Sequence, residues 1–242
     1  MMELSQKVNR ARNVAGNNIP SKIFGFFGEA IAIALAKTPV HPNALTISHF
    51  SLTVTAAIIA SFGTAESLKI CSWILLVSGT LDCADGRLAR RKNQCTRFGS
   101  YLDLTLDDLA KPALTVGFLA AFWNAGFRGL PLLAPVFVYF GDVLILQTLS
   151  RYRLEMIDSY PEDQNMEEVF QKSFLMQLGR NLMPATFLRY LGFAVFTSFG
   201  KGFLFIMLDS VYVTLLILAF IIKLGRDIYR KQSTAAGLPP AV

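Results

Sequence analysis

The chain has 242 residues, of which 53% are hydrophobic and only 17% are charged, and its formal net charge is +6. In soluble domains about a quarter of all residues are charged. The lower charged fraction of this chain therefore argues against a soluble domain and favours a helical membrane protein. The three cysteines form no Cys-x-x-Cys pair, which argues against a disulfide framework and a zinc site. The basic excess leaves nucleic acid, anionic lipid and an anionic substrate open until the positions of the charges are considered.

The first segment, residues 1–43, is expected to lie on the cytoplasmic side of a membrane. Within it, residues 21–36 are apolar but too short and too interrupted to cross the bilayer comfortably. A short helix lying along the membrane interface is therefore predicted there. Pro39 and Pro42 then break the chain before the first crossing.

Six apolar stretches follow and predict an all-α integral membrane fold with six transmembrane helices. A helix needs about 20 residues to cross a hydrocarbon core about 30 Å thick. The second and third stretches are too short alone, and each is completed by the acidic segment between them; the fifth is short and contains Arg189. The stretches are residues 44–62, 70–81, 112–127, 131–150, 187–199 and 202–222. The membrane domain is thus expected at 44–225, with a cytoplasmic tail at 226–242.

The distribution of lysine and arginine predicts the orientation of these helices. With the N-terminus in the cytoplasm, nineteen of the 23 basic residues fall on the cytoplasmic side, three fall on the opposite side, and Lys111 lies within the third helix. Basic residues collect on the cytoplasmic side of membrane proteins. Both termini and the acidic segment are therefore expected to face the cytoplasm. Because the basic residues then act as topology signals, no nucleic-acid partner is expected.

The segment that carries the chemistry is residues 81–108, LDCADGRLARRKNQCTRFGSYLDLTLDD. Asp82 and Asp85 are three residues apart and Asp103 and Asp107 are four apart, so each pair shares one face of a helix. The short link makes the two helices antiparallel neighbours that can turn these faces toward each other. Converging carboxylates at membrane depth cannot all stay ionised unaided. Their oxygen ligands predict one or two ions of Mg²⁺ or Mn²⁺.

The spacing of this segment resembles the signature of the CDP-alcohol phosphotransferase family. Every fixed position of the signature is matched, by Asp82, Asp85, Gly86, Ala89, Arg90, Gly99, Asp103 and Asp107. The sequence from His41 to Thr46, HPNALT, also resembles the beginning of the family's first membrane helix. Eight fixed positions, each with a background usage of about 5–10%, make this a specific resemblance.

The resemblance implies a six-helix membrane enzyme, usually dimeric, whose active site opens to the cytoplasm. It implies that Asp82, Asp85 and Asp103 bind metal that grips the pyrophosphate of a CDP-linked donor. Asp107 would also touch a metal and would act as the base that takes the proton from the acceptor hydroxyl. The residues expected to bind CDP are Asn43, Thr46, Asp82, Asp85, Gly86, Ala89, Arg90 and Gly99.

Three basic residues are candidates for binding the acceptor alcohol. Arg151 and Arg153 follow the fourth crossing, where they either grip an acceptor phosphate through paired hydrogen bonds or anchor the topology. Lys111, one turn after Asp107, either contacts a phosphate or offsets the acidic charges.

Several polar residues have no assigned chemistry at this stage. His41 and His49 are single histidines and are interpreted as packing or interface residues. Asp142 and Asp209 are expected to be buried charges within membrane helices, and the sequence names no partner for either.

The favoured function is transfer of a phosphatidyl group from CDP-diacylglycerol to a small polar alcohol with release of CMP, a reaction of phospholipid biosynthesis. An alternative keeps the fold and uses a soluble CDP-alcohol donor, such as CDP-choline or CDP-inositol. A distant alternative is a cation or proton transporter whose carboxylates form the ion path. A transporter accounts for the acids but not for Gly86, Ala89, Arg90 and Gly99 at their spacings.

Overall fold

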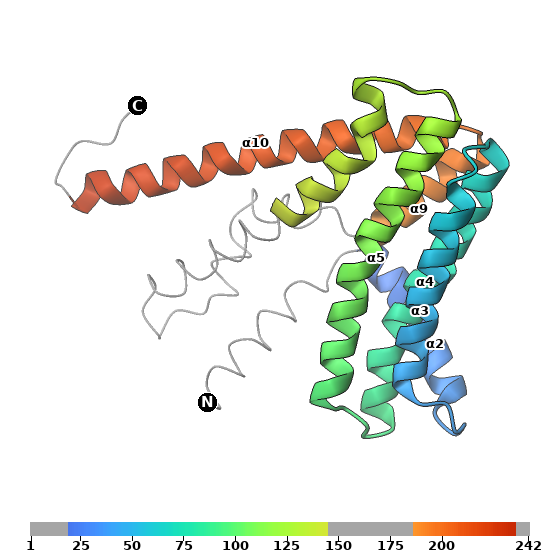
Figure 1. Cartoon of the computed structure of the whole chain (residues 1–242). Coiled ribbons are helices and arrows are strands. Elements are labelled where there is room, and N and C mark those ends of the chain that lie inside the picture. Colours follow the sequence, from blue (N-terminus) through green and yellow to red (C-terminus); the bar gives the residue numbers. More distant parts are fainter. Residues whose placement is uncertain (1–18, 145–185, 236–242) are drawn as a thin grey trace.

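The computed structural model describes residues 19–144 and 186–235, and these residues form helices joined by short connections. Figure 1 shows α3, α4 and α5 running alongside one another, with α2 beside them and α10 extending away from this bundle. The helices are α2 (Ile19–Leu35), α3 (Pro42–Ala60), α4 (Ala65–Arg91), α5 (Arg97–Asn124), the 3₁₀ helix η1 (Leu130–Leu133), α9 (Thr186–Ser198) and α10 (Gly202–Ala235). The described part of the chain is thus all-α, as the sequence predicts.

Local signals in the sequence begin and end the first long helices. Pro42 opens α3, where its fixed φ angle suits the first turn and its missing N–H costs nothing. After α3 ends, Gly63 adopts a φ of 70°, a conformation that favours glycine. Thr64 then caps α4 through a reciprocal pair of hydrogen bonds with Ser67, each 3.0 Å long. The turn between α3 and α4 is therefore encoded by its own residues.

Both helices that carry the acidic residues continue through the acidic segment without a break. α4 has 27 residues and α5 has 28, and Thr96 caps α5 by accepting a 2.9 Å hydrogen bond from the Gly99 backbone N–H. At 1.5 Å per residue, each helix is about 40 Å long. The acidic segment therefore continues the helices of both apolar stretches; α4 is long and apolar enough to cross a membrane, and the crossing by α5 stays a prediction.

The prediction that α4 and α5 are antiparallel and turn their acidic faces toward each other is confirmed at Asp82 and Asp107, although most of their packing is with α3. The two helices run in opposite directions, but α3 packs extensively against both of them, and they make little contact with each other. Gly117 of α5 allows this arrangement, because a Cβ atom there would collide with the backbone of Ala57 on α3. Small residues at the crossing let membrane helices approach closely. The acidic residues of α4 and α5 therefore meet beside α3.

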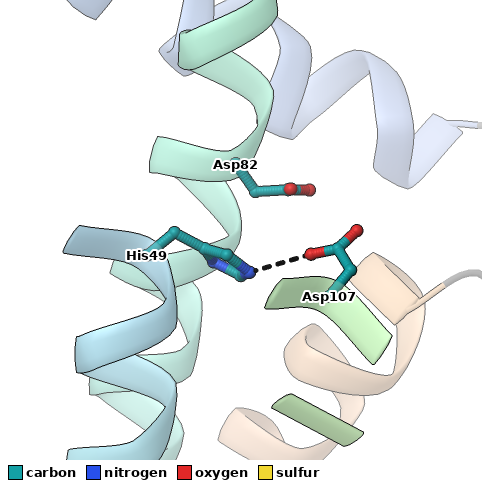
Figure 2. A group of neighbouring side chains, drawn as sticks. All are labelled: His49, Asp82 and Asp107. Atoms are coloured by element: carbon teal, nitrogen blue, oxygen red, sulfur yellow. Dashed lines mark hydrogen bonds and ion pairs between the residues drawn. The ribbon is translucent and has the colours of Figure 1, made fainter. Parts of the chain in front are cut away.

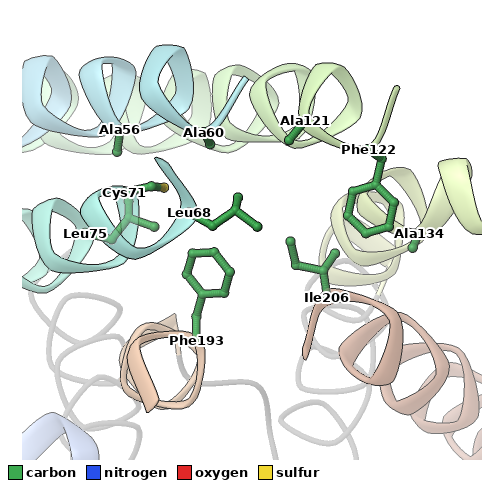
Figure 3. Packing of buried hydrophobic residues seen from close by; sticks show 10 residues of the cluster. All are labelled: Ala56, Ala60, Leu68, Cys71, Leu75, Ala121, Phe122, Ala134, Phe193 and Ile206. Carbon is green, nitrogen blue, oxygen red and sulfur yellow. The ribbon is translucent and has the colours of Figure 1, made fainter. Parts of the chain in front are cut away.

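A hydrophobic cluster holds α9 and α10 to the three-helix bundle. Figure 3 shows side chains from α3, α4, α5, α9, α10 and the segment after η1 meeting in it. Leu68 and Phe122 are almost fully buried there, and Phe193 reaches the cluster from α9. The cluster consists of Ala56, Ala60, Leu68, Cys71, Leu75, Ala121, Phe122, Ala134, Phe193 and Ile206. These contacts place α9 against α4, next to the acidic residues.

Within residues 19–144 and 186–235, three helices are long and apolar enough to cross a membrane by their length and composition. They cover Pro42–Ala60, Ala65–Arg91 and Gly202–Ala219, and they correspond to the first, second and sixth predicted crossings. The fourth predicted crossing is described only as the apolar helical segment Leu130–Leu144, and α9, within the fifth, has 13 described residues. Several apolar helices indicate an integral membrane protein, and the count of six crossings remains a prediction.

A helix, α2, is present where the interfacial helix is predicted, and it packs against α4; its position at the membrane interface stays a prediction. A Cβ atom on Gly28 would lie 2.9 Å from the Cβ of Cys83, so glycine permits this close contact. Glu29 forms ion pairs with Arg87, at 3.3 Å, and with Arg91. The hydrogen bond from Arg91 lowers the pKa of the Glu29 carboxyl. These contacts attach α2 to the half of α4 that carries the acids.

A second set of contacts ties the connection between α2 and α3 to the end of α4. Lys92 Nζ donates hydrogen bonds of 2.6 Å to the backbone carbonyls of Thr38 and Val40. The rings of Phe26 and Phe27 on α2 are exposed. Exposed aromatic side chains beside a membrane domain suit the interfacial position that the sequence predicts.

The buried charges Asp142 and Asp209 share one partner, Arg189. The guanidinium Nε of Arg189 lies 2.9 Å from Asp209 Oδ2, and Nη1 pairs with Asp142. This three-residue charge cluster borders a cavity of about 130 Å³ that Lys111 and Tyr190 also line. The three charges join α9, α10 and the segment that follows η1. The sequence names no partner for Asp142 or Asp209, and the structure shows that both pair with Arg189.

Replacing Arg189 by methionine is expected to destabilise the protein by about 3–5 kcal/mol, because two buried carboxylates lose their counter-charge. Thermal unfolding of the purified protein in detergent measures the effect. The triple variant Arg189→Met, Asp142→Asn, Asp209→Asn should recover much of the loss, since it leaves no unpaired charge. Lys201→Met, which removes an exposed cation, is the matched control. An unchanged unfolding temperature in Arg189→Met would contradict a stabilising role.

Candidate functional site

Side chains from three helices converge on one point, as Figure 2 shows. They are His49 of α3, Asp82 of α4 and Asp107 of α5, and their potential ligand atoms all lie within 4.8 Å of one another. His49 Nε2 is 3.2 Å from Asp107 Oδ1. His49 is buried, and both carboxylates are half-buried. We call these three residues the His–Asp–Asp group.

The position of the His49 ring is set by polar contacts on its other side. Its Nδ1 atom lies 3.0 Å from the backbone carbonyl oxygen of Ser78 and 2.8 Å from the Ser78 hydroxyl oxygen. Ser78 also donates a 2.9 Å hydrogen bond to the carbonyl of His49, and Thr53 lies 2.7 Å from the same hydroxyl. Two buried hydroxyls and a carbonyl thus hold the ring so that Nε2 faces the two carboxylates.

Asp85 is held separately, one turn along α4 from Asp82. It is buried, Thr46 Oγ1 donates a 2.7 Å hydrogen bond to its Oδ2, and the Gly86 backbone N–H donates a 2.5 Å bond to its Oδ1. Asp103 is half-buried and lies one turn before Asp107 on α5. Two of the four predicted metal ligands, Asp82 and Asp107, therefore belong to the His–Asp–Asp group, and Asp85 and Asp103 lie outside it.

Residues predicted to bind CDP gather at the same half of the bundle. A Cβ atom on Gly99 would lie 3.1 Å from Asn43 Oδ1, so glycine at this position lets the beginnings of α3 and α5 meet. A Cβ atom on Gly86 would lie 3.4 Å from the guanidinium of Arg90. Ala89 is half-buried on the same stretch of α4. The juxtaposition is clear, and the role of these residues in binding CDP remains a prediction.

Of the three residues proposed to bind the acceptor, only Lys111 lies within the described residues. Lys111 Nζ donates a 2.9 Å hydrogen bond to Asp108 Oδ1, which favours the interpretation that Lys111 offsets acidic charge. Lys111 also lines the cavity beside the Arg189 charge cluster. Arg151 and Arg153 lie outside the described residues.

The sequence-based interpretation of His49 as an unpaired packing residue is wrong, because His49 contacts Asp107. A signal was present in the spacing. His49 follows Thr46 by three residues, so both lie on one face of α3, and Thr46 was already predicted to serve the site. The other histidine, His41, caps α3 by accepting a 3.2 Å hydrogen bond from the Asn43 backbone N–H.

The donor set of the His–Asp–Asp group fits a divalent cation. Two carboxylates and an imidazole are common metal ligands, and Mn²⁺ accepts both oxygen and nitrogen donors. The two half-buried carboxylates repel each other at this depth, and a bound cation offsets that repulsion. Asp85 and Asp103, each one helical turn away, are placed to extend the oxygen ligands along α4 and α5.

Comparison with known families gives one match over most of the chain. The family described as CDP-alcohol phosphatidyltransferase matches residues 39–221. This range includes all three residues of the His–Asp–Asp group and all the residues predicted to bind CDP.

Two curated relatives match the chain over part of its length. Archaetidylinositol phosphate synthase of Pyrococcus horikoshii is 36% identical over 90 residues, which are 37% of this chain and 46% of the relative. The enzyme of the same name from Methanothermobacter thermautotrophicus is 39% identical over 89 residues, 36% of this chain and 44% of the relative. The chain thus spans less than half the length of these relatives.

Solved structures share the fold. The phosphatidylinositol phosphate synthase of Mycobacterium tuberculosis with CDP-DAG bound is 18% identical, with a TM-score of 0.54, and the match covers 80% of this chain and 91% of that one. The same enzyme in complex with manganese and citrate gives a TM-score of 0.54 at 18% identity, over 80% and 87% of the two chains. At this identity the likeness establishes the fold alone.

Proposed function

The chain belongs to the CDP-alcohol phosphatidyltransferase family, and from this we propose that it transfers a phosphatidyl-type group from a CDP-linked lipid to a small polar alcohol, releasing CMP. The observation that carries the proposal is the meeting of Asp82 and Asp107, from opposite ends of the signature, in one half-buried site. We favour a phosphorylated polyol such as inositol phosphate as the acceptor. The names of the two curated relatives support this acceptor.

Metal ions, Mg²⁺ or Mn²⁺, would be held by Asp82, Asp85, Asp103 and Asp107, and would neutralise the donor pyrophosphate and the leaving CMP. Asp85 is already oriented for such a role. Thr46 and the Gly86 N–H each occupy one of its oxygens and fix the plane of its carboxylate. Gly86 and Gly99 put no side chain beside the acids, on the side where the cytidine nucleotide would lie.

Asp107 would take the proton from the acceptor hydroxyl. Its Oδ1 atom lies 3.2 Å from His49 Nε2, which leaves Oδ2 to take the proton. The acceptor oxygen then bonds to the phosphorus that carries the lipid, and the bond between that phosphorus and the oxygen of CMP breaks. A carboxylate within hydrogen-bond reach of the incoming alcohol is the requirement for general-base catalysis.

Further features remain proposals that accompany this function. We expect six crossings, with both termini and the active site facing the cytoplasm, and a homodimer as the working assembly. Arg151 and Arg153 stay candidates for gripping the phosphate of the acceptor.

Release of CMP by the purified full chain tests the proposed function. The donors to compare are CDP-diacylglycerol, CDP-archaeol, CDP-choline and CDP-inositol, each with inositol phosphate, glycerol phosphate, inositol or serine as the acceptor. We expect CMP and a new phospholipid only with a lipid donor, and fastest with inositol phosphate. Samples without an acceptor measure background hydrolysis. CMP release only from the soluble donors would reject the lipid donor and favour the alternative named above.

A further inference from the structure

We infer that His49 is a ligand of the bound metal through Nε2, in addition to the acidic residues. This inference rests on the proposed function, because the family's chemistry supplies the reason for a divalent metal at Asp82 and Asp107. It adds a nitrogen donor to a site that the sequence describes as purely acidic, and the donor comes from α3, the helix that packs against both α4 and α5.

The first step of the argument is the position of the imidazole proton. Nδ1 of His49 lies 3.0 Å from the backbone carbonyl oxygen of Ser78. A carbonyl oxygen only accepts hydrogen bonds, so Nδ1 carries the proton in this contact. In the neutral ring, Nε2 then bears a lone pair and no proton. Ligand histidines characteristically donate their second N–H to a backbone carbonyl in this way.

The second step is what the Nε2 lone pair faces. It points at Asp107 Oδ1, 3.2 Å away, with Asp82 on the other side of the same space. Without a metal, a protonated Nε2 donates to Asp107; a divalent cation takes the place of that proton and binds the lone pair. His49 is only 5% exposed, so water screens the charges of the two carboxylates poorly. A cation among the three groups is attracted to both carboxylates and to the Nε2 lone pair.

The third step is the spacing of the donor atoms. All of them lie within 4.8 Å of one another. Opposite ligands of an ion with bonds of about 2.1 Å are about 4.2 Å apart, so the His–Asp–Asp group is close to the size needed for one ion. Because the three donors come from three helices, one ion would tie α3, α4 and α5 together at the site.

An imidazole ligand has a consequence for metal choice. Mg²⁺ prefers oxygen ligands, whereas transition metals such as Mn²⁺ accept imidazole nitrogen as well. The chain should therefore bind Mn²⁺ more tightly than Mg²⁺. Replacing His49 by glutamine should weaken Mn²⁺ binding by about tenfold or more, and Mg²⁺ binding by a smaller factor, because imidazole favours Mn²⁺ over Mg²⁺.

The direct test is pulsed electron paramagnetic resonance of Mn²⁺ bound to the purified full chain, which detects nitrogen atoms bonded to the metal. We expect a ¹⁴N signal that changes to a ¹⁵N signal when histidine is labelled with ¹⁵N. The chain has only two histidines, so the variants are decisive. His49→Gln should lose the signal, and His41→Gln, the matched control at the exposed cap of α3, should keep it.

Each result bears on the inference. Mn²⁺ that binds to the labelled wild-type chain without a nitrogen signal would overturn His49 as a ligand and leave the proposed function standing. Failure of the chain to bind Mn²⁺ or Mg²⁺ at all, measured by calorimetry, would overturn both. The wild-type labelling experiment does not depend on how well the His49→Gln variant folds.

Discussion

Replacing Asp107 by asparagine is expected to slow CMP release by about 10²–10⁴-fold, the usual contribution of a general base. Asparagine keeps the shape of the side chain but cannot take the proton of the acceptor hydroxyl. Binding of the CDP-linked donor should fall much less, because Asp82, Asp85 and Asp103 remain. Single-turnover rates and equilibrium binding of the donor, measured on the same preparation, separate these two effects.

The neighbouring residue offers a matched control for this variant. Asp108 is exposed and pairs with Lys111 rather than joining the His–Asp–Asp group. Asp108→Asn removes the same charge one position away and should retain most of the rate. An Asp107→Asn enzyme with a rate near that of the wild type would show that another group serves as the base.

Removal of divalent metal by EDTA is expected to abolish CMP release, and addition of Mg²⁺ or Mn²⁺ should restore it. The physical reason is the gathering of four carboxylates beside a donor that itself carries a charged pyrophosphate. Without a cation, these negative charges repel one another and the donor in a half-buried site. The measurement is the rate of CMP release as a function of the concentration of each metal after chelation.

Substitution of Asp82 tests whether this carboxylate contributes to the metal requirement. Asp82→Asn should raise the metal concentration needed for half-maximal rate and should also weaken donor binding, since Asp82 belongs to the His–Asp–Asp group. Cys95→Ser, a change at an exposed position outside the site, should leave the metal requirement as it was. Undiminished turnover in a chelated, metal-free sample would reject the proposed mechanism altogether.

Helix faces, turns and caps are set by residues that are close together in the sequence. The spacings of Asp82 with Asp85, and of Asp103 with Asp107, predict two helix faces because the helical repeat is a property of the backbone itself. Both helices are present and unbroken. The turn at Gly63 and the cap at Thr64 are likewise consequences of neighbouring residues. Features of this kind need no knowledge of the rest of the chain.

The packing between helices is less fully encoded locally: the sequence predicts that the acids of α4 and α5 converge, as Asp82 and Asp107 do, but not that α3 contributes to the same site. A short link between two helices predicts that they are neighbours, but it does not say whether a third helix packs against both. The close approach of Gly117 to the Ala57 backbone is one contact by which α3 packs against α5. This one arrangement brings His49 to Asp107 and explains why a histidine without any recognisable motif lies in the centre of the site.

By itself, the sequence determined that this protein is helical, apolar enough for a membrane, and equipped with the spaced acids of its family. Only the tertiary structure decided which charges meet: His49 with Asp107, 58 residues apart, and Arg189 with Asp142, 47 residues apart. The physical reason is range. Helix formation and capping depend on groups a few residues apart, whereas a contact between helices depends on how each helix is rotated and how closely its small residues let it approach its neighbour.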